Sequence, residues 1–170
     1  MNYRILGAIL VIVSSGGMGF SLAAAHKREE NALKQLLRAL GFMACELEYR
    51  LPPLDQLCAA VAGQVSGVVR SVFTALSVQL TQQIEADAHI CVETVLKQHP
   101  ALPAMAEREL HLLGKSLGRF DLAGQLSGIR AVEELCRRDL QGLQNNQAAR
   151  LRTYRTLGIC AGIALVILFI

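Results

Sequence analysis

The strongest constraint on this chain is an uncharged apolar segment near its N-terminus, residues 5–25. Arg4 precedes the segment, and the basic cluster His26-Lys27-Arg28 follows it directly. Because an α-helix rises about 1.5 Å per residue, a helix of this length spans about 30 Å, the thickness of the hydrocarbon core of a bilayer. A signal peptide cleaved near residues 23–25 is the alternative. The length of the segment and the basic cluster after it favour an uncleaved transmembrane helix.

A second uncharged segment covers residues 157–170. It is shorter than the ~17–25 residues of a full span, but Arg152 and Arg155 can extend their charged ends to the headgroups of a helix that starts earlier. Basic residues gather on the inner side of both segments, which by the positive-inside rule places the middle of the chain in the cytoplasm. We therefore expect a transmembrane helix over residues 1–26, a cytoplasmic helical domain over 27–152 and a second transmembrane helix over 153–170.

Both terminal segments carry small residues four positions apart. In the first segment they are Ser15 and Gly19, and in the second Gly158 and Gly162. This spacing allows two membrane helices to approach closely, so these four positions are candidates for helix packing in the bilayer. Small residues are also common in such segments without a packing role, and the sequence does not separate the two interpretations.

Between the terminal segments, apolar residues recur at steps of three and four, which is typical of amphipathic helices. Proline and glycine divide this region into predicted helices near residues 29–50, 55–65, 68–84, 86–98 and 103–114, and a long one from 121. Asp55 and Asp121 are predicted to cap the second and the last of them. The expected fold class is all-α, an antiparallel helical bundle of about five or six helices with hydrophobic membrane helices at both termini.

The sequence holds none of the common catalytic or phosphate-binding motifs, such as GxxxxGK[ST], GxGxxG, HExxH or GxSxG. The net charge of +3 comes from interleaved acidic and basic residues, which gives little support to nucleic-acid binding. Five cysteines without a CxxC pair are expected to be buried free thiols. They are Cys45, Cys58, Cys91, Cys136 and Cys160. We expect no enzyme activity, no cofactor, no metal and no small-molecule substrate.

Two pairs of glutamate and histidine have the spacing of one helical turn. They are Glu85 with His89 and Glu107 with His111. Solvated pairs on a helix surface are the simpler interpretation of this spacing. A small metal-binding or enzymatic helical bundle anchored to the membrane is the alternative function.

Two short segments differ from ordinary helix surfaces. Residues 46–54 join a helix end to a rigid proline turn, and residues 117–125 place a glycine turn before a predicted helix cap. Both are explained either as helix punctuation or as part of a partner-binding surface. The candidate binding residues are Tyr49, Arg50, Pro53, Leu117, Gly118, Asp121 and Gln125.

These segments, together with the hydrophobic ends, resemble the stage III sporulation protein AB family of endospore-forming bacteria. That family has a Gly-Phe near the end of its first hydrophobic helix, a Glu-x-x-Tyr before a Pro-Leu turn, and a Leu-Gly-x-x-Asp-x-x-x-Gln motif. The matching residues are Gly19, Phe20, Glu46, Tyr49, Pro53, Leu54, Leu117, Gly118, Asp121 and Gln125. Leu51-Pro52 departs from the Thr-Pro-type turn of the family.

The resemblance implies a component of a channel or secretion-like complex that links mother cell and forespore, located in the mother-cell membrane around the forespore. The central domain is similar to the cytoplasmic domains of the type II secretion inner-membrane platform protein F. By this analogy it is a non-enzymatic platform or scaffold. Its expected partners are a cytoplasmic ATPase of the same complex, other membrane subunits and the lipid bilayer.

Overall fold

The structure, a computed structural model, describes the backbone of residues 2–82, 87–117 and 121–169, and the side chains of residues 24–82, 87–117 and 121–145. Within these residues the chain forms six α-helices and no strand, which confirms the all-α fold class. The helices are α1 (Asn2–Tyr49), α2 (Leu54–Gln64), α3 (Gly67–Thr81), α4 (Ala88–Gln98), α5 (Ala104–Ser116) and α6 (Leu122–Phe169).

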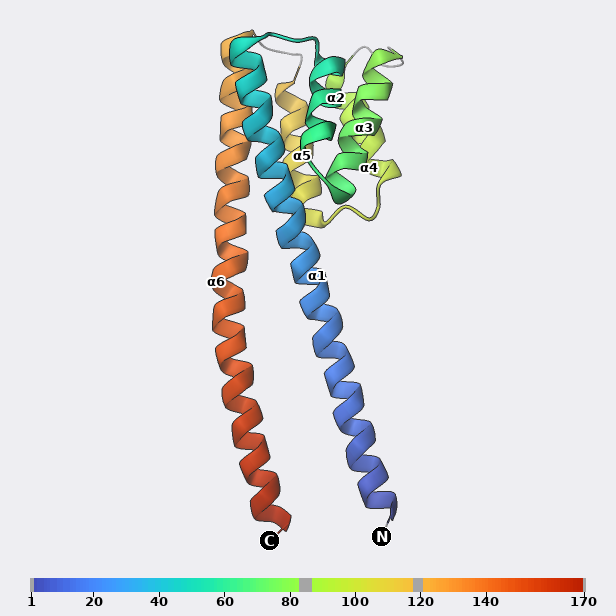
Figure 1. Ribbon diagram of the computed structural model, residues 1–170, viewed down its shortest axis with the longest axis vertical. Coiled ribbons are helices and arrows are strands. Elements are labelled where there is room, and N and C mark those ends of the chain that lie inside the picture. Colours follow the sequence, from blue (N-terminus) through green and yellow to red (C-terminus); the bar gives the residue numbers. More distant parts are fainter. Residues whose placement is uncertain (1, 83–86, 118–120, 170) are drawn as a thin grey trace.

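Consecutive helices run in opposite directions, so the bundle is antiparallel (Figure 1). The long helices α1 and α6 lie side by side and extend beyond the four short helices at the end that carries both termini (Figure 1). We call the opposite end of the bundle the distal end. The C-terminal ends of α1, α3 and α5 meet there with the N-terminal ends of α2, α4 and α6 (Figure 1). Segments far apart in the sequence are therefore gathered at one end.

The core is built from the apolar stripe of each helix. In α1 the stripe contains Leu33, Leu36 and Leu40, all fully buried, and α6 packs against it with Ile129 and other apolar side chains. Burying one leucine completely contributes about 1.5–3 kcal/mol relative to leaving it in water. The period of three and four residues predicted this stripe because it places these side chains on one face of a helix.

Side chains of α1 satisfy backbone groups at two helix starts in the short-helix part of the bundle. The Oε1 atom of Gln35 accepts a hydrogen bond from the backbone N of Ser66, the residue that caps α3, at 3.0 Å. Glu29 accepts another from the backbone N of Met105, in the first turn of α5, at 3.4 Å. The first N–H groups of a helix have no partner within the helix, and a carboxylate near them also interacts favourably with the helix dipole.

Arg108 of α5 pairs both with a buried carboxylate of its own helix and with a carboxylate of α6. The side chain of Glu109 is fully buried, and the Arg108 guanidinium bonds its Oε1 atom at 2.8 Å and also pairs with Asp139 of α6. The hydrogen bond to Glu109, ahead of the charges of Asp139 and Glu109, raises the pKa of Arg108. Because an unpaired buried charge costs several kcal/mol, this pairing lets a carboxylate remain in the core.

The helix boundaries differ from the sequence predictions in two informative ways. The second helix begins at Leu54 after Pro53, and no side chain caps it, so the prediction that Asp55 is its cap is wrong. Asp121 does cap α6, since its Oδ1 accepts a hydrogen bond from the backbone N of Gly124 at 3.0 Å. Leu51 has a φ of 48°, in the left-handed region that a residue after a helix often adopts.

Both predicted membrane segments lie within long helices, and the expected domain boundaries at residues 26 and 152 fall inside α1 and α6. In the part of the chain that the structure describes, no helix combines the length and the apolar character needed to cross a bilayer. Ser15, Gly19, Gly158 and Gly162 lie in the parts of α1 and α6 where the structure describes the backbone alone. The transmembrane helices and their packing positions stay predictions.

A glycine at the contact of α5 and α6 provides a test of this packing. A Cβ atom added to Gly128 would lie 2.4 Å from the Cβ of Ser116, which no side-chain rotation relieves. We expect Gly128→Ala to lower the free energy of unfolding by about 1–3 kcal/mol, the usual cost of overpacking. Urea unfolding of the purified chain, followed by circular dichroism, measures the change.

Gly142 in the same helix is the matched control, since an added Cβ there meets nothing within 4 Å. Gly142→Ala is expected to raise the free energy of unfolding by about 0.5–1 kcal/mol through helix propensity. Equal effects of the two substitutions would contradict the close contact of α5 with α6.

Candidate partner-binding surface

The two segments singled out in the sequence lie together at the distal end. α1 ends at Tyr49 and α6 begins at Leu122, and these antiparallel helices contact each other (Figure 1). An ion pair between Arg130 Nη2 and Glu48 Oε2, 3.6 Å apart, joins the two helices near this end. Residues about seventy positions apart in the sequence are thus brought to one end of the bundle.

Several apolar and charged side chains are exposed at this end. Tyr49 and Leu51 are 81% and 60% exposed, although both are large apolar residues. The side chain of Arg50 is 78% exposed. Its Nη1 atom lies 3.9 Å from Glu46 Oε2, a long distance for an ion pair, so the pairing is loose. We call these residues, with others exposed beside them, the distal surface. Its members are Tyr49, Arg50, Leu51, Pro53, Asp121 and Leu122.

Two of the predicted binding residues are not exposed parts of this surface. Leu117 is buried at 2% exposure and belongs to the core, so its side chain is not available to a partner. Gln125 is partly buried, and its backbone N bonds Asp121 O at 2.9 Å in the first turn of α6. Gly118 lies outside the described residues. Leu117 therefore ends α5, and Gln125 belongs to the first turn of α6.

Sequence analysis missed Leu51 and Leu122 as members of the distal surface. Composition did not distinguish them, because apolar residues make up 52% of the chain. Their positions could have predicted their exposure, since each leucine lies next to a helix end and outside the apolar stripe that faces the core. Leu51 also precedes Pro52, a context that directs the chain away from helix.

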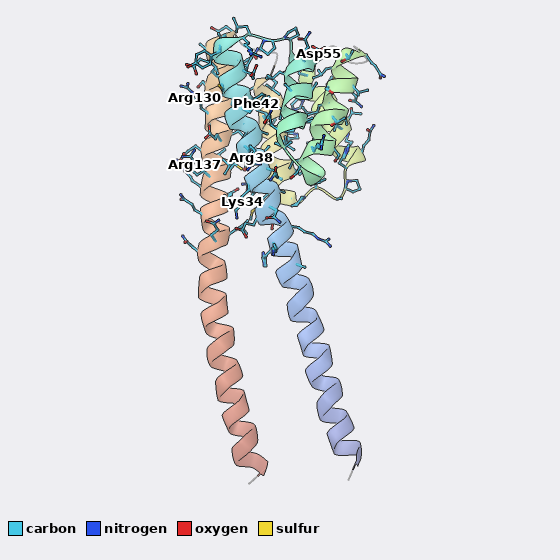
Figure 2. The ribbon with its side chains drawn as sticks, in the orientation of Figure 1. Lys34, Arg38, Phe42, Asp55, Arg130 and Arg137 are labelled. Carbon is cyan, nitrogen blue, oxygen red and sulfur yellow. The ribbon has the colours of Figure 1, made fainter. Side chains whose placement is uncertain are left out.

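The outer faces of α1 and α6 carry many basic side chains but little unbalanced charge. Figure 2 shows Lys34 and Arg38 on α1 and Arg130 and Arg137 on α6. Lys34 lies 2.6 Å from Glu30, and Arg137 lies 2.7 Å from Glu133. Such exposed pairs contribute at most about 1 kcal/mol, and their acidic partners remove the uniform positive potential that nucleic acid requires.

The cysteines show no nucleophilic site within the described residues. Cys58, Cys91 and Cys136 are buried as expected, but Cys45 is exposed, so the prediction was wrong for that residue. Burial, followed by the charge of Asp55, raises the pKa of Cys58 to about 12. Burial, followed by the charges of nearby carboxylates, likewise raises the pKa of Cys136 to about 12. Cys160 lies outside the described side chains.

The structure brings one histidine of each predicted Glu/His pair to another glutamate, Glu93. Glu85 lies outside the described residues, and His89 is 3.7 Å from Glu93, one turn further along α4. His111 on α5 contacts the same Glu93 at 3.1 Å, which brings two histidines from different helices to one carboxylate. Sequence analysis did not consider Glu93, because its relation to His111 depends on how α4 packs on α5.

Comparison with known proteins identifies the family. The sequence profile described as "Stage III sporulation protein AB (spore_III_AB)" matches residues 4–170 of the chain. The chain belongs to this family. It is 26% identical to Stage III sporulation protein AB of Bacillus subtilis (strain 168) over 168 residues, which cover 97% of this chain and 98% of that protein. The resemblance inferred from the sequence is therefore confirmed.

A solved structure extends the comparison to three dimensions. The structure of a Stage III sporulation protein AB (SpoIIIAB) superposes with a TM-score of 0.65 at 23% identity, covering 72% of this chain and 98% of that one. At this identity the likeness supports the helical fold.

Thiol alkylation tests the burial pattern. In the native protein at pH 8, iodoacetamide is expected to modify Cys45 rapidly and to leave Cys58 and Cys136 unmodified until denaturant is added. A pKa raised to about 12 leaves very little thiolate at that pH, and burial blocks access. Peptide mass spectrometry measures each site. Native modification of Cys58 or Cys136 at the rate of Cys45 would contradict the core packing.

Proposed function

We propose that this family member is a non-enzymatic membrane platform of a sporulation channel or secretion-like complex, and that its distal surface binds a cytoplasmic ATPase of that complex. The observation that carries the proposal is the position of the two family segments. Both lie at the end of the bundle opposite the chain termini, and each contributes exposed side chains there (Figure 1).

Membrane attachment at the termini would give this surface its orientation. The hydrophobic segments and their basic flanks support two transmembrane helices with a cytoplasmic domain between them. From residue 26 to Tyr49, α1 would then carry the distal surface about 35 Å from the membrane boundary, at 1.5 Å per residue. A soluble ATPase could reach it there, while other membrane subunits would contact the terminal helices.

The composition of the distal surface suits protein recognition. Tyrosine and arginine are over-represented among residues that dominate binding energy, and Tyr49 and Arg50 are adjacent and highly exposed. Leu51 and Leu122 add apolar area, and Asp121 adds an opposite charge beside them. Arg50 has only a loose contact with Glu46, so a partner carboxylate could replace that contact at small cost.

Charge reversal at Arg50 tests the binding role. We expect Arg50→Glu in the full-length chain to weaken binding of the purified ATPase by about tenfold or more, because it places a second anion next to Glu46 and removes a cation from the interface. Biolayer interferometry with the chain held in nanodiscs measures the affinity. Asp121→Ala would not separate binding from folding, since it would also remove the cap of α6.

Arg137→Glu is the matched control. Arg137 is also an exposed arginine paired with a glutamate one turn earlier, but it lies on the outer face of α6 away from the distal end (Figure 2). The control should bind as the unchanged chain does. Equal affinity of the Arg50→Glu and unchanged chains, with unfolding midpoints preserved, would remove the distal surface from the ATPase interface.

Membrane topology provides an independent test. Single cysteines near Gln64 and Gln144, on a cysteine-free background, should resist a membrane-impermeant thiol reagent in intact cells and react after the membrane is opened. Such protection is what a cytoplasmic domain requires. Immediate labelling would place the domain outside the cytoplasm and separate the distal surface from any cytoplasmic ATPase.

A further inference from the structure

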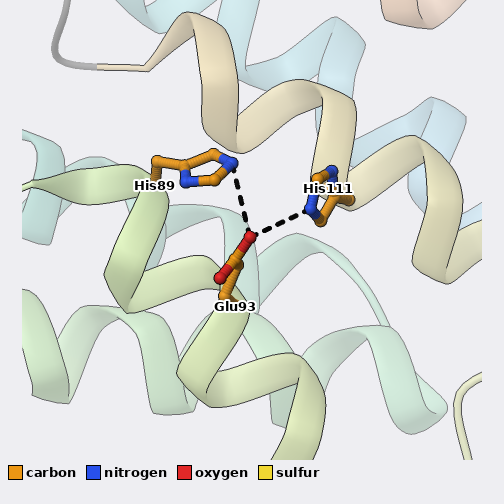
Figure 3. Close-up of side chains that lie close together, drawn as sticks. All are labelled: His89, Glu93 and His111. Atoms are coloured by element: carbon orange, nitrogen blue, oxygen red, sulfur yellow. Dashed lines mark hydrogen bonds and ion pairs between the residues drawn. The ribbon is translucent and has the colours of Figure 1, made fainter.

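We propose that His89, Glu93 and His111 form a zinc site that joins α4 to α5. His89 and Glu93 stand one turn apart on α4, so their side chains project from the same face of the helix. His111 on α5 points toward them, and the three side chains converge (Figure 3). Neither the family resemblance nor the proposed platform function is needed for this inference.

The distances between the side-chain atoms fit a tetrahedral ion. Glu93 Oε1 lies 3.1 Å from His111 Nε2 and 3.7 Å from His89 Nε2. Two ligands bound at about 2.0–2.1 Å to a tetrahedral zinc ion are about 3.3–3.5 Å apart. One ligand atom from each residue lies within 4.8 Å of the others. Small side-chain rotations would therefore bring all three atoms to one ion.

An unsatisfied nitrogen points to a ligand at the same place. His89 Nε2 is buried and makes no hydrogen bond, although it faces the shared oxygen of Glu93. Buried polar atoms nearly always have a partner, so this nitrogen and the Glu93 oxygen that it faces leave a place for a ligand between them. A cation between them would satisfy both. Asp87 holds His89 in place, since its side chain accepts the backbone N–H of His89 at 3.0 Å.

The set of ligands and its access to solvent favour zinc. Two histidines and one glutamate are a known zinc ligand set, whereas magnesium and calcium prefer oxygen ligands. Glu93 and His111 also line an open groove of about 430 Å³ between α4 and α5, which gives an ion an entry path. Three protein ligands leave a fourth position, which water from the groove can fill.

Zinc binding to the full-length chain tests the site. Cys45→Ser serves as the background, so that the exposed thiol cannot hold metal. After treatment with a chelator, titration calorimetry should show one zinc ion per chain, and zinc should raise the unfolding midpoint by about 5 °C or more. Magnesium should do neither. His111→Ala and Glu93→Gln should each lower zinc affinity by more than the ~10–100-fold typical of lost outer-shell partners.

His99→Ala is the matched control, because His99 lies at the end of α4 and bonds Val95 O of its own helix. It should bind zinc as the background chain does. Cobalt bound to the background chain should give the strong visible absorption of a tetrahedral site, a readout that does not depend on any variant at the site. Absence of stoichiometric zinc, or equal affinities for the His111→Ala and His99→Ala chains, would overturn the proposal.

Discussion

The contact between α1 and α6 determines where every other part of this molecule lies. Buried leucines of α1 pack against α6, and the Cys136 thiol of α6 donates a hydrogen bond to Leu33 O at 3.5 Å. Because the two helices are antiparallel and continuous, both chain termini emerge at one end. The connection that leaves α1 and the residues that start α6 must then share the opposite end. The distal surface is a consequence of this pairing.

The two long helices provide hydrogen-bond and ion-pair partners for polar groups of the short helices. Gln35 and Glu29 of α1 accept N–H groups at the starts of α3 and α5, and Asp139 of α6 pairs with Arg108 of α5. In each contact, a polar side chain of a long helix binds a polar group of a short helix or of the residue that caps it. Helices of 11–15 residues are marginal alone in water, so this support and the shared core account for their stability.

Local chemistry predicted the helices well, since their order, breaks and apolar stripes follow from periodicity, proline and glycine. The sequence predictions were wrong or incomplete where a helix boundary, the exposure of a side chain or a contact between helices depends on the three-dimensional packing. Asp55 was an incorrect cap because the tandem prolines start α2 at Leu54, which places Asp55 inside the first turn and Pro53 at the cap position. Cys45 is exposed because it lies between core positions Met43 and Leu47 on the opposite face of α1. The meeting of His111 with Glu93 depends on the packing of α4 on α5, which no spacing within one helix encodes.

The platform role proposed above requires a connection between the two chain ends and the distal surface, and the two long helices provide one. From residue 24 to Tyr49, α1 contains no proline, and its interior is held by the core on one face along this length. A continuous helix moves as a unit, so displacement of the N-terminal end of α1 would displace Tyr49 and the neighbouring Arg50. The packed core between α1 and α6 would make α6 follow α1 at the distal end. Binding of the proposed partner there would act on both terminal segments together.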